Sequence, residues 1–194
     1  LGPIAVQQAL NHMRYNELPA EKRGGPRFYV EDNIDPARMD ALFDVIDIKK
    51  TCFNVITKSG STSETMAQFL IIADKLKKAG VPLKDNMIAT TDKAKGNLIK
   101  IAQQEGLKTF VIPDGVGGRF SEMTPVGLLG AAVCGIDIKE LIAGARYMDG
   151  LLQSENVMEN MAYLDGALQY LCMENGINVS VMMPYADSLK YMSD

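Results

Sequence analysis

The sequence has few of the residues on which common active sites depend. Its single histidine, His12, lies on the polar side of a helical pattern and has no evident partner among its neighbours. Catalytic triads and most zinc sites use histidine as a base or a ligand. The sequence therefore supports neither a hydrolase triad nor a histidine-based metal site, and we expect no bound metal.

Cysteine is scarce too. Cys52, Cys134 and Cys172 are far apart, and each has apolar neighbours. No CxxC pair is present, which argues against a zinc or redox motif. An odd number of separated cysteines predicts buried, reduced thiols in a cytoplasmic protein.

Long apolar runs and an excess of positive charge are missing as well. The longest apolar candidate, Val126–Ile138, contains three glycines and falls short of the ~20 residues that cross a bilayer. The first residues lack the basic start of a signal peptide. The formal net charge is −4, which argues against a broad nucleic-acid-binding face. We expect neither a membrane nor a nucleic acid as partner.

What the sequence does contain is an alternation of short apolar runs with helical patterns. Five runs are expected to be strands: Arg27–Asp32, Cys52–Thr57, Asn86–Thr91, Thr109–Pro113 and Ile177–Pro184. The first four are continuous rather than alternating, which is typical of parallel strands covered on both faces. The pattern predicts one α/β domain over residues 1–194, with a parallel sheet and helices on both of its faces.

Capping residues mark the expected helices. Asp35 and Pro36 fit the N-cap and first position of one helix, and Pro125 fits the start of another. Gly80 and Pro82 fit the end of a third. Ligands in such folds collect beyond the carboxyl ends of the strands, where the two most unusual segments fall.

The first of these segments, Thr57–Thr65, joins a predicted strand to a predicted helix, and six of its nine residues carry a hydroxyl group. Small side chains, unpaired backbone N–H groups and the helix dipole favour an anion there. The segment lacks GxxxxGK[ST] and GxGxxG, so a phosphate monoester fits better than a nucleoside triphosphate or a dinucleotide. The candidate phosphate-binding residues are Thr57, Lys58, Ser59, Ser61 and Thr62. A capping box formed by Ser61 and Glu64 is the competing explanation.

The second segment, "DGVGGRFSEMTPVG", follows the fourth predicted strand. Its glycines permit a tight backbone close to a ligand, and Arg119 projects from the loop. This arginine is either an ordinary solvated side chain or a permanent charge that stabilises an oxyanion. The residue types alone leave both interpretations open.

Together the two segments resemble the glucose-6-phosphate isomerase family. "DGVGGRFSEMTPVGLLGA" resembles the family's Gly-Gly-Arg-[Phe/Tyr]-Ser signature, and "VITKSGSTSET" resembles the sugar-phosphate loop of its sugar-isomerase (SIS) domain. The similarity continues at both ends of the chain. "LGPIAVQQAL" resembles the helix after the family's Gly-Gly-Ser turn, and "VMMPYADSLKYMSD" resembles the segment before its catalytic glutamate region.

The resemblance implies an SIS (flavodoxin-like) fold, a three-layer α/β/α sandwich with a five-stranded parallel sheet. It implies interconversion of glucose 6-phosphate and fructose 6-phosphate through a cis-enediolate, without metal or organic cofactor. It further implies a homodimeric parent enzyme in the cytoplasm. The positions that hold the phosphate match Thr57, Lys58, Ser59 and Thr62. Lys58 and Glu64 match supporting active-site residues, and Arg119 with the backbone of Gly118 matches the group that stabilises the enediolate.

The departures from the family are equally specific. The family's general-base glutamate, ring-opening histidine and late lysine belong to segments outside this sequence, and the Gly-Gly-Ser turn before Leu1 is absent. The expectation is therefore an SIS domain truncated at both ends and inactive alone, since the proton transfer lacks a base. A non-catalytic SIS-type regulator that senses sugar phosphates is the alternative. A flavodoxin-like nucleotide binder is disfavoured by the missing glycine fingerprints.

Overall fold

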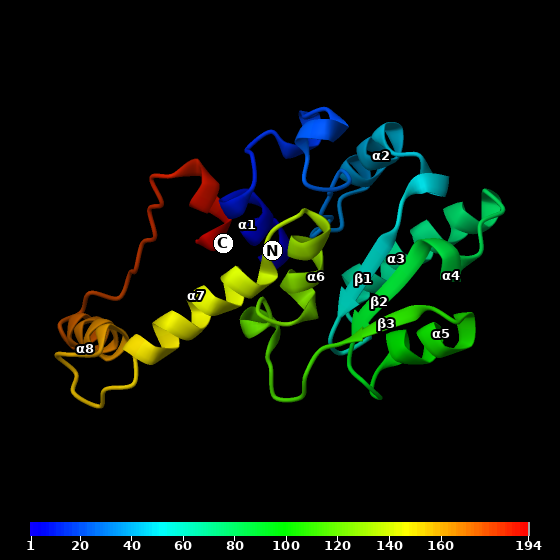
Figure 1. Cartoon of the computed structure of the whole chain (residues 1–194). Coiled ribbons are helices and arrows are strands. Elements are labelled where there is room, and N and C mark those ends of the chain that lie inside the picture. Colours follow the sequence, from blue (N-terminus) through cyan, green and yellow to red (C-terminus); the bar gives the residue numbers. More distant parts are fainter. Residues whose placement is uncertain (194) are drawn as a thin grey trace.

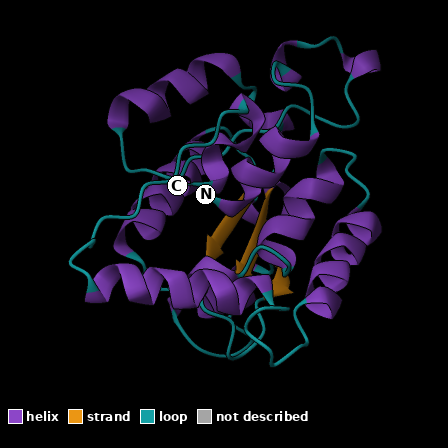
Figure 2. Cartoon of the chain, turned by 90° about the vertical axis from the view of Figure 1, so that its left-hand side faces the viewer, coloured by secondary structure: helices purple, strands orange, loops and turns teal. Residues whose placement is uncertain are grey.

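A three-stranded parallel sheet lies at one side of the computed structural model, which describes residues 1–193 (Figure 1). The strands are β1 (Phe53–Thr57), β2 (Met87–Thr91) and β3 (Lys108–Val111), in the order β1-β2-β3. Thr57 pairs with Thr91, and Thr91 pairs with Val111. The carboxyl ends of all three strands therefore meet at one edge, as the arrowheads in Figure 2 show.

Helices connect and surround the strands. The α-helices are α1 (Gly2–Leu10), α2 (Pro36–Val45), α3 (Ser63–Lys78), α4 (Leu83–Asn86), α5 (Asn97–Glu105), α6 (Pro125–Val133), α7 (Ile138–Leu151) and α8 (Met161–Glu174). The described residues also form five 3₁₀ turns: η1 (Tyr15–Glu17), η2 (Ala20–Lys22), η3 (Ile48–Lys50), η4 (Gly118–Phe120) and η5 (Asp187–Met192). Among the described residues, no helix is both long and apolar enough to pass through a membrane.

The expected helix starts are confirmed. Asp35 caps α2 by accepting hydrogen bonds from the backbone N–H groups of Ala37 and Arg38. Thr124 caps α6 by accepting one from Val126. At the other end of α3, Gly80 takes a left-handed φ of 72°, which suits a residue just past a helix terminus.

The main core lies between one face of the sheet and the helices α3 and α5. Strands in sequential order joined by right-handed crossovers place the connecting helices on the same face of a sheet. The buried residues of this core are Phe53, Val55, Phe69, Ile72, Leu76, Met87, Ala89, Leu98, Ala102 and Leu107. On the opposite face of the sheet, Ile56 and Ile88 are only half-buried.

The expectation of five strands is wrong for the described residues, and the first missing strand is 27–32. Its backbone is bonded by side chains instead of a neighbouring strand. Asn16 Nδ2 donates to the carbonyl of Phe28 at 2.7 Å, and the N–H of Phe28 donates to Asn16 Oδ1 at 2.8 Å. Further along, the Arg38 guanidinium donates to the carbonyl of Val30. These bonds hold the segment extended but outside the sheet.

The second missing strand is 177–184. It follows α7 and α8, which lead away from the sheet (Figure 1), so no strand edge of the described chain is beside it. Its apolar side chains are exposed, for example Val179 at 79% and Met182 at 73%. A β-propensity without an adjacent strand cannot form a ladder, which explains this error.

The expectation for the cysteines holds for one of the three. Cys134 is buried, whereas Cys52 and Cys172 are exposed. Burial raises the pKa of the Cys134 thiol to about 11. Apolar neighbours in the sequence indicated burial at all three positions, but Cys172 lies on α8, which buries no residue.

The core predicts a contrast between two leucines of α3. Leu76 is fully buried, whereas Leu70 is 62% exposed. We expect Leu76→Ala to lower the free energy of unfolding by about 2–5 kcal/mol, because it removes buried methyl groups and leaves a cavity. Leu70→Ala, the matched control, should change it by less than about 0.5 kcal/mol. Urea unfolding followed by circular dichroism measures both, and equal effects would contradict this core.

Candidate functional site

Four hydroxyl groups gather where β1 passes into α3. Thr57 Oγ1 lies 3.0 Å from Thr62 Oγ1, and Ser59 Oγ lies 3.3 Å from Thr62 Oγ1 and 3.5 Å from Thr57 Oγ1. Ser61 Oγ donates to Ser59 Oγ at 3.4 Å. Thr57 is buried, whereas the other three are exposed. We call these four residues the hydroxyl cluster, and each hydroxyl can rotate to serve as donor or acceptor.

The first turn of α3 stands directly beside this cluster. Thr62 is the N-cap, but no side chain caps the helix. The first backbone bond at this end runs from the N–H of Met66 to the carbonyl of Thr62. The N–H groups of residues 63–65 thus have no partner in the described chain, as at any uncapped helix start.

The capping box expected as the competing explanation is not formed. Glu64 is exposed, and Thr62 rather than Ser61 occupies the N-cap position. The hydroxyl groups are bonded to one another and leave the helix amides free. This arrangement suits an anion, since free amides and the helix dipole both favour negative charge.

The cluster is fixed from the side by the start of α5. The carbonyl of Gly60 accepts hydrogen bonds from the N–H groups of Asn97 (3.2 Å) and Leu98 (3.1 Å). The approach is so close that a Cβ on Gly96 would lie 2.1 Å from the carbonyl oxygen of Ser59. Gly96 also has a φ of 93°, which side-chain-bearing residues rarely adopt.

Asp92 organises the loop between β2 and α5. Its Oδ1 accepts hydrogen bonds from the backbone N–H groups of Ala94 and Lys95, each at 2.8 Å. These two bonds, with Ala94 the larger, hold the pKa of the Asp92 carboxyl below its ordinary value. The carboxylate therefore stays ionised and keeps this loop folded beside Gly96.

Lys58 connects the hydroxyl cluster to the glycine–arginine segment. Its Nζ donates a hydrogen bond to the carbonyl oxygen of Val116, 58 residues further along the chain. Val116 belongs to the loop that leaves β3 and leads to Arg119. The two segments singled out in the sequence are therefore in direct contact through this lysine.

The turn around Arg119 has its own internal bonds. Ser121 Oγ donates to the carbonyl of Gly118 at 2.6 Å, and Thr124 Oγ1 donates to the carbonyl of Ser121 at 2.6 Å. Ser121 and Thr124 are buried, whereas Gly118 and Arg119 are exposed. No ion pair or hydrogen bond of the Arg119 or Glu64 side chain is found among the described residues. Arg119 is thus an exposed cation with no partner among the described residues, on a turn that its internal hydrogen bonds hold in place.

The structure brings together Thr57, Ser59, Ser61 and Thr62 and links Lys58 to Val116. Among the described residues, no hydrogen bond or ion pair joins these five to Glu64, Gly118 or Arg119. Sequence reasoning missed Asp92 and Gly96, which support the cluster from the side. Both follow a predicted strand in "TTDKAKGN", where an aspartate and a glycine are typical of a turn, so a signal was present.

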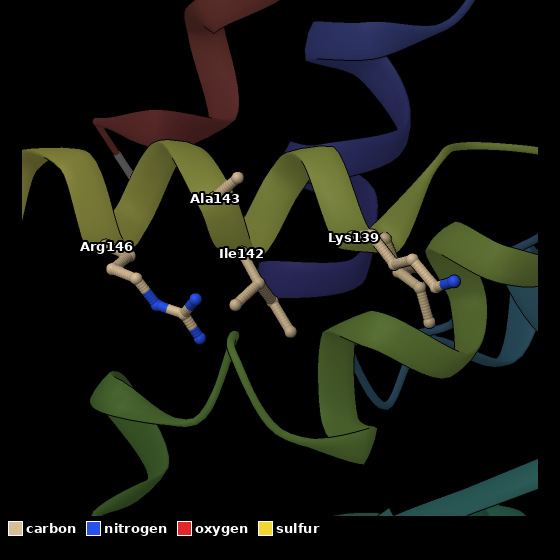
Figure 3. A pocket seen from close by; sticks show the side chains of 5 residues that line it. Lys139, Ile142, Ala143 and Arg146 are labelled. Carbon is tan, nitrogen blue, oxygen red and sulfur yellow. The ribbon is translucent and has the colours of Figure 1, made fainter.

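Two pockets of the described chain lie elsewhere. One, of about 300 Å³, is lined by Ile138, Lys139, Ile142, Ala143 and Arg146 of α7. Figure 3 shows Ile142 and Arg146 pointing toward the loop that precedes α6. The other, of about 350 Å³, lies between α1 and residues 28–31. The hydroxyl cluster lines neither pocket and, apart from Thr57, is exposed at the edge of the sheet.

His12 takes no part in the site. It is exposed, and its Nδ1 accepts a hydrogen bond from the backbone N–H of Arg14 at 3.0 Å. In residues 1–193 no group of three or more His, Cys, Asp or Glu side chains is placed to hold a metal ion.

Comparison with known proteins gives one family. The sequence profile described as Phosphoglucose isomerase matches residues 1–194. A glucose-6-phosphate isomerase of Carboxydothermus hydrogenoformans is 60% identical over 100% of this chain and 42% of its own length. One of Rubrobacter xylanophilus is 44% identical over 100% of this chain and 45% of its own length. The chain thus spans less than half the length of these relatives.

Solved structures show a similar fold. The crystal structure of a hypothetical protein from Thermus thermophilus matches 98% of this chain and 43% of its own, with a TM-score of 0.84 and 34% identity. A glucose-6-phosphate isomerase from Chlamydia trachomatis matches 99% of this chain and 36% of its own, with a TM-score of 0.80 and 24% identity. The second likeness concerns the fold alone.

The close approach at Gly96 predicts a contrast between two glycines. Gly96→Ala should lower the free energy of unfolding by about 1–3 kcal/mol, because it forces a strained φ and a clash with Ser59. Gly144, in the exposed middle of α7, has nothing within 4 Å of an added Cβ. Gly144→Ala should raise the free energy of unfolding by about 0.5–1 kcal/mol. Urea unfolding of both variants checks this, and a harmless Gly96→Ala would refute the packing at the cluster.

Proposed function

Because this chain belongs to the phosphoglucose isomerase family, we propose that it is the SIS domain through which an aldose–ketose isomerase binds its sugar phosphate. The substrate would be glucose 6-phosphate or fructose 6-phosphate, interconverted by proton transfer through a cis-enediolate. The activity belongs to the whole protein, since the chain spans less than half of its relatives. We further propose that this protein is a cytoplasmic homodimer.

The observation that carries the proposal is the hydroxyl cluster beside the uncapped start of α3. A phosphate dianion needs several donors and is favoured by a helix N-terminus. The hydroxyls of Thr57, Ser59, Ser61 and Thr62 are linked by oxygen–oxygen distances of 3.0–3.5 Å, and three backbone amides beside them are free. Lys58 lies between Thr57 and Ser59 in the chain and adds a positive charge, which bonds the carbonyl of Val116.

Arg119 is proposed to act on the reacting end of the sugar. An enediolate gains negative charge as the transition state is approached, so a fixed guanidinium stabilises the transition state more than the substrate. Gly118, which precedes it in η4, would contribute its backbone, and Glu64 and Lys58 would support the site. The Lys58–Val116 hydrogen bond supports this proposal, because it joins the segment of the hydroxyl cluster to the loop that carries Arg119.

The first experiment tests the phosphate site by calorimetry on the chain itself. We expect heat from glucose 6-phosphate but none from glucose, because the phosphate supplies the charge. Thr62→Val keeps the shape of the side chain and removes a hydroxyl, so it should weaken binding by about tenfold, the effect of one hydrogen bond to a charged group. Thr109→Val, at an exposed position of β3, is the matched control.

Equal binding of glucose and glucose 6-phosphate would refute the proposal that the hydroxyl cluster binds the phosphate group. Binding of glucose 6-phosphate with no isomerisation by the chain alone is expected, because the chain supplies no assigned base. If the intact protein that contains this chain also binds without turnover, the sensing function is favoured over the isomerase.

The second experiment tests Arg119 in that intact protein. Arg119→Ala should lower kcat by more than it raises KM, because a group that acts mainly in the transition state affects the chemical step. Arg119→Lys should recover part of the loss, since it restores charge without the planar fork. Arg27→Ala, at another exposed arginine, is the control. An effect on KM alone would reassign Arg119 to substrate binding.

A further inference from the structure

Glu122, three residues after Arg119, places its carboxyl group inside the protein. Both of its carboxyl oxygens are buried, and neither has a hydrogen-bond partner among the described residues. Buried polar groups in native proteins almost always have a partner, so such an exception calls for an explanation. None of the roles proposed above uses this side chain.

The carboxyl occupies space left by two glycines at the starts of α1 and α6, which pack together. A Cβ on Gly2 would lie 1.7 Å from Glu122 Oε2, and a Cβ on Gly127 would lie 1.9 Å from Glu122 Oε1. Glu122 therefore fits as a wedge between the two helices. An alanine at either glycine would displace it.

The charges that face this wedge are few. Desolvation by burial raises the pKa of the Glu122 carboxyl above its ordinary value. Helix α1 has no titratable side chain. The segment 125–133 of α6 has no titratable side chain. On its own loop the nearest charged residue in sequence is Arg119, which is exposed. Burial therefore favours the neutral acid.

The Glu122 side chain is directly linked to the turn of residues 118–124, which carries Arg119. Ser121, which precedes Glu122, donates to the carbonyl of Gly118 at 2.6 Å, and the carbonyl of Ser121 accepts from Thr124 Oγ1 at 2.6 Å. Both of these hydroxyl-bearing residues are buried. A displacement of Glu122 would therefore move the bonded turn that presents Arg119.

We propose that Glu122 is a positioning residue for Arg119: the neutral carboxyl, wedged between α1 and α6, seats the turn of residues 118–124, and ionisation releases it. The position of the turn is a property of this chain, and only its consequence for Arg119 rests on the proposed function. A carboxyl with a raised folded-state pKa stabilises the fold at low pH, and this contribution is lost as pH rises through that pKa.

Nuclear magnetic resonance of the chain tests the proposal without any ligand. The Glu122 Cδ resonance should titrate with a midpoint above the ordinary glutamate value of about 4.3. The amide resonances of Gly118 and Arg119 should shift with the same midpoint. Glu122→Gln, an uncharged side chain of the same size, should abolish that shift, whereas Glu105→Gln, at an exposed position of α5, should leave it unchanged.

Two results would overturn the proposal: a Glu122 midpoint at or below the ordinary value, or amides at 118 and 119 that do not respond at the midpoint of Glu122. The wild-type titration gives this answer even if Glu122→Gln fails to fold. Failure of glucose 6-phosphate to bind would refute the proposed function but leave this titration intact. The two hypotheses can therefore fail separately.

Discussion

The alignment of the three strand ends is the constraint on which the rest of the structure depends. Thr91 is central to it, because its Oγ1 donates to the carbonyl of Thr57 at 2.7 Å and its own carbonyl accepts from the N–H of Ile112 at 2.9 Å. Because of these bonds, the carboxyl ends of β1, β2 and β3 lie side by side at one edge of the sheet. The hydroxyl loop, the Asp92 loop and the arginine loop therefore leave the sheet side by side, as the parallel topology requires.

At that edge the two helix starts have different partners. The amides of Asn97 and Leu98 at the start of α5 are used by the carbonyl of Gly60, so α5 holds the hydroxyl loop in place. The amides at the start of α3 have no such partner in the described chain, and the neighbouring hydroxyls bond to one another. Helix α5 thus supports the hydroxyl cluster, whereas the start of α3 faces outward from it. This division explains why a loop so rich in hydroxyls caps no helix.

Much of this arrangement could be predicted from the sequence, because local signals and tertiary structure agree over residues 52–133. Strands at 52–57, 86–91 and 109–113 are confirmed to within a few residues, and their parallel order placed both unusual segments at one edge. The strands at 27–32 and 177–184 were wrong, since strand formation needs a neighbouring strand that propensity cannot supply. The wedge of Glu122 was also missed, because its burial depends on Gly2, 120 positions away in the chain.

The site is therefore built on two separate supports. The hydroxyl cluster rests on β1, α3 and α5, whereas the turn that carries Arg119 rests on α6 and, through Glu122, on α1. Among the described residues the side-chain bond that joins these supports runs from Lys58 to Val116. A ligand that spans both would add a second connection, and part of its binding energy would be spent on fixing their relative position. The proposed function would require the guanidinium at one definite place over the reacting carbon, and in that case Lys58 would act as a spacer as well as a charge.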